Sequence, residues 1–333
     1  MTSMEGAGGA ASGRLWDRIF EPESLSTVFQ PIVEIHGGER SVFAVEALTR
    51  GPRGTNIERS DVLFEYVRRK RGEARVDRLA IASALREARA FQGSADLPGL
   101  CLNIHAATLE QDRDLPCWLH GLAGEHEIPG ERLIVEIVEH APPWSGRCFL
   151  DSLDRLRALG LRIALDDVGL GQSNFRMILD CRPDLLKIDR HFVAGAGRDD
   201  HRRAVLESIA GLARRLGGRA VAEGVEDEED LAAAAAAGID LFQGFLLARP
   251  SSPRNAPCQD PHHPGPLLPP PPNPPPREKR ETSKTAPTGF PSPGEGGWEG
   301  AGEGTGVRAL GRGRFERKAV PTPPTPAPAR SRP

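Results

Sequence analysis

The chain has 333 residues and a formal net charge of −3, and its composition divides it into two parts. Residues 251–333 hold 21 of the 31 prolines and carry 12 Lys and Arg against 7 Asp and Glu, which leaves residues 1–250 with a net charge of −8. An acidic body argues against a nucleic-acid polymer as partner, because such binding needs basic residues that neutralise phosphates. No stretch approaches the roughly 20 apolar residues that span a bilayer, so we expect no membrane span.

The cysteines indicate a reducing compartment. They are odd in number, widely spaced and without a CxxC pair: Cys101, Cys117, Cys148, Cys181 and Cys258. This pattern favours neither a zinc site nor a disulfide framework. The N-terminus also lacks the basic start and apolar run of a signal peptide. We therefore predict a cytoplasmic protein with reduced thiols.

Composition predicts three segments: a flexible N-terminus (1–14), a folded domain (15–253) and a disordered, low-complexity tail (254–333). The tail opens with the proline run at 267–276 and continues through a Gly- and Glu-rich stretch at 294–306. It offers too little apolar area to oppose the entropy of ordering. A solvated tail is favoured over a PxxP ligand for an unknown partner, and a reading-frame extension in GC-rich DNA would give a similar composition.

Within the folded part, apolar runs of strand length alternate with helical patterns. The expected strands are 28–35, 42–48, 100–104, 133–138, 162–168, 184–188, 219–222 and 241–245. The expected helices are 61–70, 73–91, 148–159, 201–216 and 228–237. Eight strands in about 240 residues predict an α/β fold, a TIM-like (β/α)₈ barrel, with an open doubly wound sheet as the alternative. The first two strands are joined only around Gly37 and Gly38, too short a link for a parallel crossover, so the first strand should be antiparallel.

Polar side chains interrupt these apolar runs near the strand ends. They are Glu46, Asn103, Glu136, Asp166, Asp167, Lys187, Asp189, Glu223, Glu226 and Gln243. Carboxylates inside apolar strands are costly unless they are paired or bind a metal, and the carboxyl ends of barrel strands meet at one mouth. An oxygen-only ligand set suits Mg²⁺ or Mn²⁺ better than zinc or copper. The adjacent pair Asp166 and Asp167 suits two neighbouring ions, an arrangement used for displacement at phosphorus.

One segment, VEALTRG (45–51), resembles the ExLxR signature of the EAL-domain family, the cyclic di-GMP phosphodiesterases. Further motifs resemble those of the family in the same order: FQPIVEI (29–35), CLNIH (101–105), VEIVEH (135–140), LDDVGLGQSNF (165–175), LLKID (185–189), AEGVE (222–226) and FQGFLLARP (242–250). The resemblance covers residues 15–253. Val168 stands where the family usually has phenylalanine, but no expected metal ligand is missing.

The resemblance implies a role for each matching residue. The implied ligands of a first ion are Glu46, Asn103, Glu136 and Asp166, and those of a second are Asp166, Asp167 and Glu223, with Asp166 bridging. The implied catalytic residues are Lys187, which would orient the attacking water, Glu223 as general base, and Glu46. The implied substrate contacts are Gln30, Leu48, Arg50, Asp189 and Gln243. The implied loop and dimer residues are Glu139, Gly169, Gly171, Ser173 and Glu226.

Together these roles imply a homodimeric domain with two Mg²⁺ or Mn²⁺ ions that hydrolyses cyclic di-GMP to linear 5′-pGpG. Because few residues precede the first expected strand, we expect a stand-alone domain. One alternative is a catalytically weak EAL-type receptor or protein-interaction module, and another is a different metal-dependent barrel hydrolase. Single residues also have structural interpretations. Arg50 could be a surface arginine, Glu226 could cap the helix that starts near Asp227, and Asp189 could hold backbone N–H groups.

Overall fold

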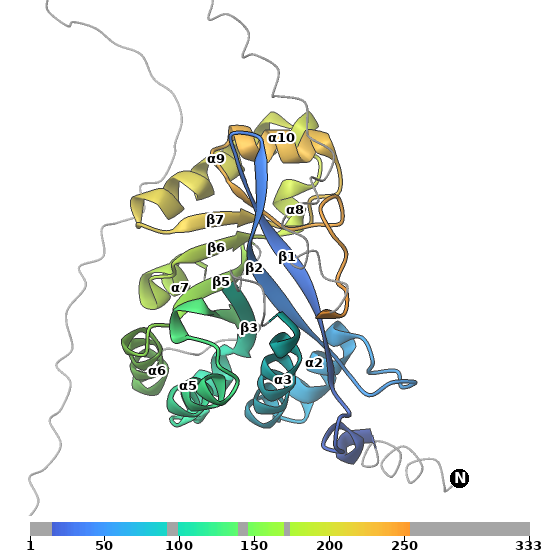
Figure 1. The fold of residues 1–333 in the computed structure, drawn as a ribbon. Helices are drawn as coiled ribbons and strands as arrows, with labels where there is room; N and C mark the ends of the chain where they lie inside the picture. Colours follow the sequence, from blue (N-terminus) through green and yellow to red (C-terminus); the bar gives the residue numbers. More distant parts are fainter. Residues whose placement is uncertain (1–14, 92–98, 139–145, 170–173, 254–333) are drawn as a thin grey trace, which may run out of the picture. The chain divides into compact units, whose positions relative to one another are not determined.

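The computed structural model describes residues 15–91, 99–138, 146–169 and 174–253, and these form a closed barrel of eight strands in the order β1 to β8 (Figure 1). The strands are β1 (Ser26–His36), β2 (Glu39–Arg50), β3 (Gly99–His105), β4 (Leu133–Val138), β5 (Arg162–Val168), β6 (Leu185–Ile188), β7 (Arg219–Ala222) and β8 (Leu241–Phe242). β1 pairs antiparallel with both β2 and β8, and the other neighbours pair parallel. The predicted barrel with a reversed first strand is confirmed, and the open sheet is excluded.

The reversal of β1 comes from the turn that follows it. Gly37 and Gly38 have φ angles of 60° and 91°, and His36 pairs with Glu39 directly across them. Two-residue hairpin turns with positive φ at both positions match the twist of the strands and favour glycine. The local sequence therefore forms a hairpin that reverses the chain direction here.

Helices surround the barrel and turn apolar faces toward it. They are α2 (Ser60–Arg69), α3 (Glu73–Ala88), α4 (Ala106–Gln111), α5 (Leu115–Glu125), α6 (Arg147–Ala158), α7 (Asn174–Cys181), α8 (Arg190–Val193), α9 (Asp200–Arg215) and α10 (Glu228–Ala236). Three short 3₁₀ segments, η1 (Arg89–Phe91), η2 (Gly130–Arg132) and η3 (Ala196–Arg198), complete the described elements. In α6 the buried residues Phe149, Leu153 and Leu156 share one side of the helix. Among the described helices, none is long and apolar enough to cross a membrane.

The structure departs from the predicted elements in two ways. The expected helices at 61–70, 73–91, 148–159, 201–216 and 228–237 are present, whereas helices α4, α5, α7 and α8 were not predicted. The last strand ends at Phe242 rather than at 245. Beyond the strand, Gly244 lies against the backbone of the loop after β7, where an added Cβ would be 2.0 Å from the carbonyl oxygen of Val225.

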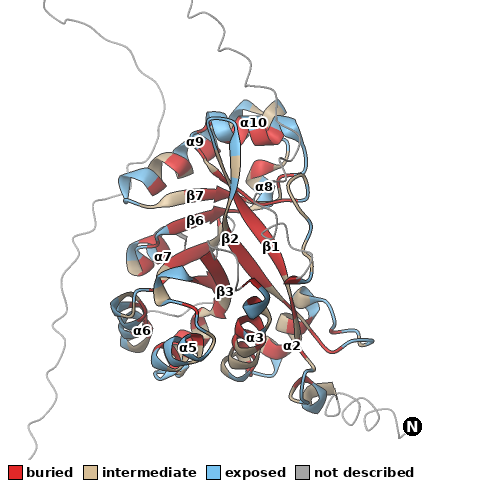
Figure 2. Ribbon diagram, viewed as in Figure 1, coloured by how far each residue is buried: buried red, intermediate tan, exposed pale blue. Residues whose placement is uncertain are grey.

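The barrel interior is built in layers, one apolar and the next polar. Figure 2 shows the strands as mostly buried. The apolar layer takes one side chain from each strand: Ile32, Ala44, Cys101, Ile134, Ala164, Leu185, Val221 and Leu241. Since side chains alternate between the two faces of a strand, the next inward positions lie two residues away, toward the mouth of the barrel. Those positions are Gln30, Glu46, Asn103, Glu136, Asp166, Lys187, Glu223 and Gln243.

Candidate active site

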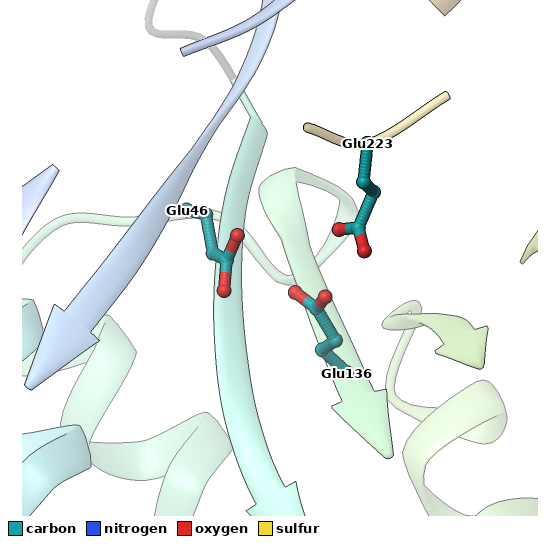
Figure 3. Close-up of side chains that lie close together, drawn as sticks. All are labelled: Glu46, Glu136 and Glu223. Atoms are coloured by element: carbon teal, nitrogen blue, oxygen red, sulfur yellow. The ribbon is translucent and has the colours of Figure 1, made fainter. Parts of the chain in front are cut away.

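Lys187 lies at the centre of the polar layer. Its Nζ is 2.6 Å from Glu223 Oε1, 3.3 Å from Glu46 Oε2 and 3.4 Å from Asp166 Oδ1. It also contacts Glu136 Oε1. Figure 3 shows the carboxylates of Glu46, Glu136 and Glu223 pointing toward one another; Glu46 and Glu136 lie on β2 and β4, and Glu223 directly follows β7. One buried ammonium group therefore faces four carboxylates, so negative charge predominates at the mouth of the barrel.

Two amides fix the carboxylate of Glu46. Asn103 Nδ2 donates to Glu46 Oε1 at 2.9 Å, and Gln243 Nε2 donates to Glu46 Oε2 at 2.7 Å. Gln243 also lies 3.4 Å from the amide oxygen of Gln30. Burial raises the pKa of Glu46, but Lys187 and the two amide donors outweigh it and lower the pKa below its usual value. Glu46 is therefore held ionised and in one orientation.

A β-bulge brings two neighbouring aspartates to the same side of β5. The pairing of β5 with β6 shifts register between Leu165 and Val168, and Asp167 has a φ of 52°. In a regular strand consecutive side chains point to opposite faces, whereas a bulge re-aims one of them. As a result Asp166, Asp167 and Glu223 each place one carboxylate oxygen within 4.8 Å of the others.

These carboxylates form two groups that could each hold a metal ion. One group is Glu46, Glu136 and Glu223, and the other is Asp166, Asp167 and Glu223. Glu136 is fully buried, yet its Oε2 atom has no hydrogen-bond partner among the described residues. A buried oxygen without a donor is costly, and a divalent cation would satisfy it. The oxygen-only donors fit Mg²⁺ or Mn²⁺. Both groups share Glu223, and bridging by Asp166 remains a prediction.

The crowding of carboxylates also changes their acidity. Burial, together with the charges of Glu223 and Asp167, raises the pKa of Asp166 well above its usual value. Burial raises the pKa of Glu223 to about 7, with Lys187 opposing this shift and Glu46 adding to it. For Lys187 itself, burial lowers the pKa, but Glu223 and Glu46 outweigh it and raise the pKa. Lys187 therefore stays a cation, while Glu223 exchanges its proton near neutral pH.

Two cavities adjoin the carboxylates. The larger, of about 300 Å³, lies between the ends of β2 and β3 and helix α2. Its lining includes Leu48, Phe64, Asn103, His105 and Asp166. The smaller, of about 230 Å³, is lined among others by Gln30, Asp189, Glu223, Glu226 and Gln243. Four of the five expected substrate contacts, all except Arg50, therefore line a cavity beside the candidate metal site.

Comparison with known proteins assigns the family. The family model described as EAL domain matches residues 15–250. The chain is a member of the EAL-domain family. It is 32% identical over 151 residues to the cyclic di-GMP phosphodiesterase RocR of Pseudomonas aeruginosa, covering 45% of this chain and 38% of that protein. It is 36% identical over 134 residues to the probable cyclic di-GMP phosphodiesterase PdeD of Escherichia coli, covering 39% of this chain and 24% of that protein.

A solved structure of the family has the same fold. The complex of Klebsiella pneumoniae BlrP1 with calcium and cyclic di-GMP superposes with a TM-score of 0.61 at 28% identity, covering 69% of this chain and 56% of that chain. The chain thus spans less than half the length of the two curated relatives and little more than half of BlrP1. The reversed-strand barrel is the EAL barrel, and a divalent ion accompanies the dinucleotide in the BlrP1 complex.

Arg50, the last residue of the EAL motif, lies at the end of β2 and does not line either cavity. Its Nη1 donates to Thr49 O at 3.1 Å and lies 3.5 Å from Ser60 Oγ, and Ser60 lines the larger cavity. Burial lowers the pKa of Arg50, and Glu46 opposes the shift. The guanidinium is thus next to the larger cavity without facing it.

The structural interpretations of Asp189 and Glu226 have different outcomes. Asp189 does hold a backbone group: its carboxylate accepts a hydrogen bond from His191 N at 2.6 Å at the start of α8, although it also lines the smaller cavity. Burial and the neighbouring carboxylate of Asp189 raise the pKa of Asp167. Glu226 does not cap α10, because Asp227 does. Glu226 instead pairs with Arg190 at 3.1 Å.

The structure describes only some of the expected loop and dimer residues. Glu139, Gly171 and Ser173 lie outside the described residues, and their expected roles remain predictions. Gly169 is described and has a φ of 113°, a conformation that suits only glycine. Val168, which replaces the usual phenylalanine of the family, is 4% exposed and pairs with Ile188 on β6.

One interacting group of this EAL domain was not predicted from its sequence. His105 lines the larger cavity, and its Nδ1 lies 2.8 Å from Asp77 Oδ1. The buried Asp77 also accepts from His105 N at 2.9 Å and from Thr108 Oγ1 at 2.6 Å. Burial lowers the pKa of His105, but Asp77 outweighs it and raises the pKa. The available signal was the acidic Asp77 among the apolar positions that α3 buries.

Proposed function

We propose that this EAL domain hydrolyses cyclic di-GMP to linear 5′-pGpG with two Mg²⁺ or Mn²⁺ ions. The observation that supports it most is the pair of carboxylate groups sharing Glu223 around a buried lysine at the mouth of the barrel. Barrel enzymes place their active sites at this end. The cavities on two sides of the carboxylates also suit a cyclic dinucleotide, which has two bases to place.

The ion ligands we propose are those implied by the family motifs: Glu46, Asn103, Glu136 and Asp166 for one ion, and Asp166, Asp167 and Glu223 for the other. When bound, the two ions would lower the pKa of the attacking water and neutralise charge on the phosphate. Such ions would also add positive charge to a cluster in which Lys187 now faces four carboxylates. They would satisfy the buried carboxylate oxygen of Glu136.

Glu223 and Lys187 divide the remaining work. As the family motifs imply, the Glu223 carboxylate would act as general base and take the proton of the attacking water. Lys187 stays protonated, so it orients the water and stabilises negative charge on the phosphate rather than removing a proton. A bond forms between the water oxygen and phosphorus, and the bond from phosphorus to the 3′ oxygen breaks. The leaving 3′ oxygen takes up a proton from solvent, so the products are a 3′-hydroxyl and a 5′-phosphate.

We also propose that the domain forms a homodimer through α7. Phe175 and Leu179 are 77% and 72% exposed and lie one turn apart, so they form an apolar strip on this helix. Arg176 and Asp180 lie beside the strip, one turn apart, with Arg176 Nε 3.4 Å from Asp180 Oδ2. A helix that presents both charges beside an apolar strip is complementary to an antiparallel copy of itself.

The cytoplasmic location and the absence of a nucleic-acid partner stay predictions from composition.

The experiment measures cyclic di-GMP turnover with Mn²⁺ and separates the products by chromatography. We compare the full chain with Glu46→Gln, which keeps the side-chain shape but removes a proposed ligand. The matched control is Glu34→Gln, because Glu34 is a carboxylate at the opposite end of the barrel, where it binds Arg219. We expect pGpG from the full chain and the control but not from Glu46→Gln. Dinucleotide binding without turnover by the folded, Mn²⁺-loaded chain would instead support the receptor alternative.

A further inference from the structure

The end of β5 has an unusual backbone. Asp167 has a φ of 52°, and two residues later Gly169 has a φ of 113°. The first angle is uncommon for a residue with a side chain, and the second is open only to glycine. Conformations of this kind persist when surrounding structure holds them in place. Contacts from neighbouring elements are therefore expected to hold residues 167–169 in place.

The ring of Phe192 lies directly on the backbone of Gly169. A Cβ placed on Gly169 would be 2.3 Å from Phe192 Cε2 and 2.7 Å from Cζ, so nothing larger than glycine fits beneath the ring. Phe192 comes from α8, which begins immediately after β6. The packing therefore joins the ends of two neighbouring strands through a contact between one side chain and one backbone.

Phe192 is itself held in place. Its backbone N donates to Asp189 O at 3.0 Å, and the Asp189 carboxylate accepts from His191 N at 2.6 Å. The rings of His191 and Phe192 pack edge to face with their centroids 5.5 Å apart. Within the bulge, the buried Val168 pairs with Ile188. Two contacts from β6 and the helix that follows it therefore hold the bulge: Ile188 against Val168, and Phe192 against Gly169.

We propose that Phe192 is the positioning residue for Asp167, the candidate ligand of the second ion. This inference rests on the proposed function and adds to it a residue that contacts neither ion nor substrate. Without the ring, residues 167–169 relax toward extended backbone, in which Asp167 points to the face opposite Asp166. Of the proposed ligands of the first ion, Glu46, Asn103 and Glu136 lie on other strands, and Asp166 precedes the two residues with positive φ, so this ligand set keeps its geometry. Loss of Phe192 therefore weakens one ion site and spares the other.

The test titrates the metal-free full chain with Mn²⁺ by calorimetry, and compares the wild type with Phe192→Ala and Phe192→Leu. The wild type is expected to bind two ions. In Phe192→Ala the first ion binds as in the wild type and the second binds about tenfold more weakly, which corresponds to roughly 1.4 kcal/mol of backbone strain no longer offset. Phe192→Leu keeps most of the apolar contact and should show a smaller loss. Turnover by Phe192→Ala should recover at high Mn²⁺.

The matched control is Phe91→Ala. Phe91 is a buried phenylalanine that packs 5.0 Å from the ring of Phe29, away from α8. A general loss of stability would act alike in both alanine variants, whereas the positioning role predicts a change in the ratio of the two affinities only for Phe192→Ala. Equal weakening of both ions, or the same ratio in Phe91→Ala, overturns the inference.

The result also separates this inference from the proposed function. A wild-type chain that binds no Mn²⁺ and produces no pGpG contradicts the proposed function itself. A wild type that turns over cyclic di-GMP, with Phe192 variants of unchanged second-ion affinity, contradicts only the positioning role. If Phe192→Ala does not fold by circular dichroism, Phe192→Leu decides: a selective loss supports the role, and wild-type affinities overturn it.

Discussion

The two ends of the barrel both carry charged side chains, but they arrange them differently. At the end where the parallel strands begin, Arg219 lies 2.5 Å from Glu34 and 2.7 Å from Asp240, so one cation meets two anions at a half-exposed site. The ring of Phe43 lies near two guanidinium groups there. Its centroid is 5.1 Å from the guanidinium carbon of Arg219 and 5.3 Å from the guanidinium carbon of Arg162. At the mouth, one buried lysine meets four carboxylates.

The difference indicates which end is built for stability and which for chemistry. Charges that are paired locally and remain partly hydrated are stable without a ligand, and each pair contributes only modestly to the free energy of folding. Buried charges of one sign in excess are unfavourable unless a ligand supplies the opposite charge. The mouth therefore needs a bound cation to balance its carboxylates, whereas the charged side chains at the other end need no ligand. Substitutions at the two ends should give different effects.

The largest difference is expected from removing each end's cation. Lys187→Met leaves four carboxylates, of which Glu46 and Glu136 are buried, without this counter-charge, so the free energy of unfolding of the metal-free protein should fall by about 3–5 kcal/mol. Arg219→Met removes a partly hydrated cation and should cost about 1 kcal/mol or less. Urea denaturation of the two variants measures both values, and equal losses would contradict the comparison. Mn²⁺ should restore the stability of Lys187→Met and have no such effect on Arg219→Met.

The sequence predicted much of this arrangement. The order of apolar runs and helical patterns predicts the barrel, and the Gly37–Gly38 link predicts its reversed strand. The polar layer also follows from sequence, because Glu46 and Glu136 interrupt apolar strands whose ends must meet. These features depend on local spacing, which a single chain displays directly.

The remaining features depend on contacts between distant segments. Nothing in the pair Asp166 and Asp167 indicates which residue takes the left-handed conformation, because that depends on packing against β6 and α8. The contact of His105 with Asp77 joins a strand end to a helix that precedes it in the chain, and no spacing rule connects them. Short helices such as α7 have too few residues to show a clear apolar period.

The next effect in size concerns pH and is confined to the mouth. In the metal-free folded state the pKa of Glu223 is raised to about 7, so between its usual value near 4.5 and about 7 the folded protein keeps a proton that the unfolded chain has lost. The raised pKa of Asp166 acts in the same direction. Stability of the metal-free protein should therefore fall by about 1–3 kcal/mol as pH rises through this window.

Thermal unfolding from pH 5 to 7.5, with and without Mn²⁺, measures this dependence. Mn²⁺ must displace the proton that Glu223 holds, so the affinity of the protein for Mn²⁺ should rise with pH over the same window. With Mn²⁺ bound, the fall in stability should disappear. Glu223→Gln should reduce the slope of the metal-free profile, since this side chain no longer titrates and its charge no longer raises the pKa of Asp166. A profile that keeps its slope in Glu223→Gln would show that the proton is held elsewhere.

The smallest effect is expected from the aromatic ring at the opposite end. Phe43→Leu keeps an apolar side chain against the first interior layer but removes the ring between Arg162 and Arg219, so the free energy of unfolding should fall by about 1 kcal/mol. The two guanidinium groups keep their other partners, because Arg219 remains paired with Glu34 and Asp240. Turnover and Mn²⁺ affinity should stay at wild-type values, since the apolar layer separates Phe43 from the mouth. A change in either would mean that the two ends are coupled through that layer, and the division between a structural end and a chemical end would then have to be abandoned.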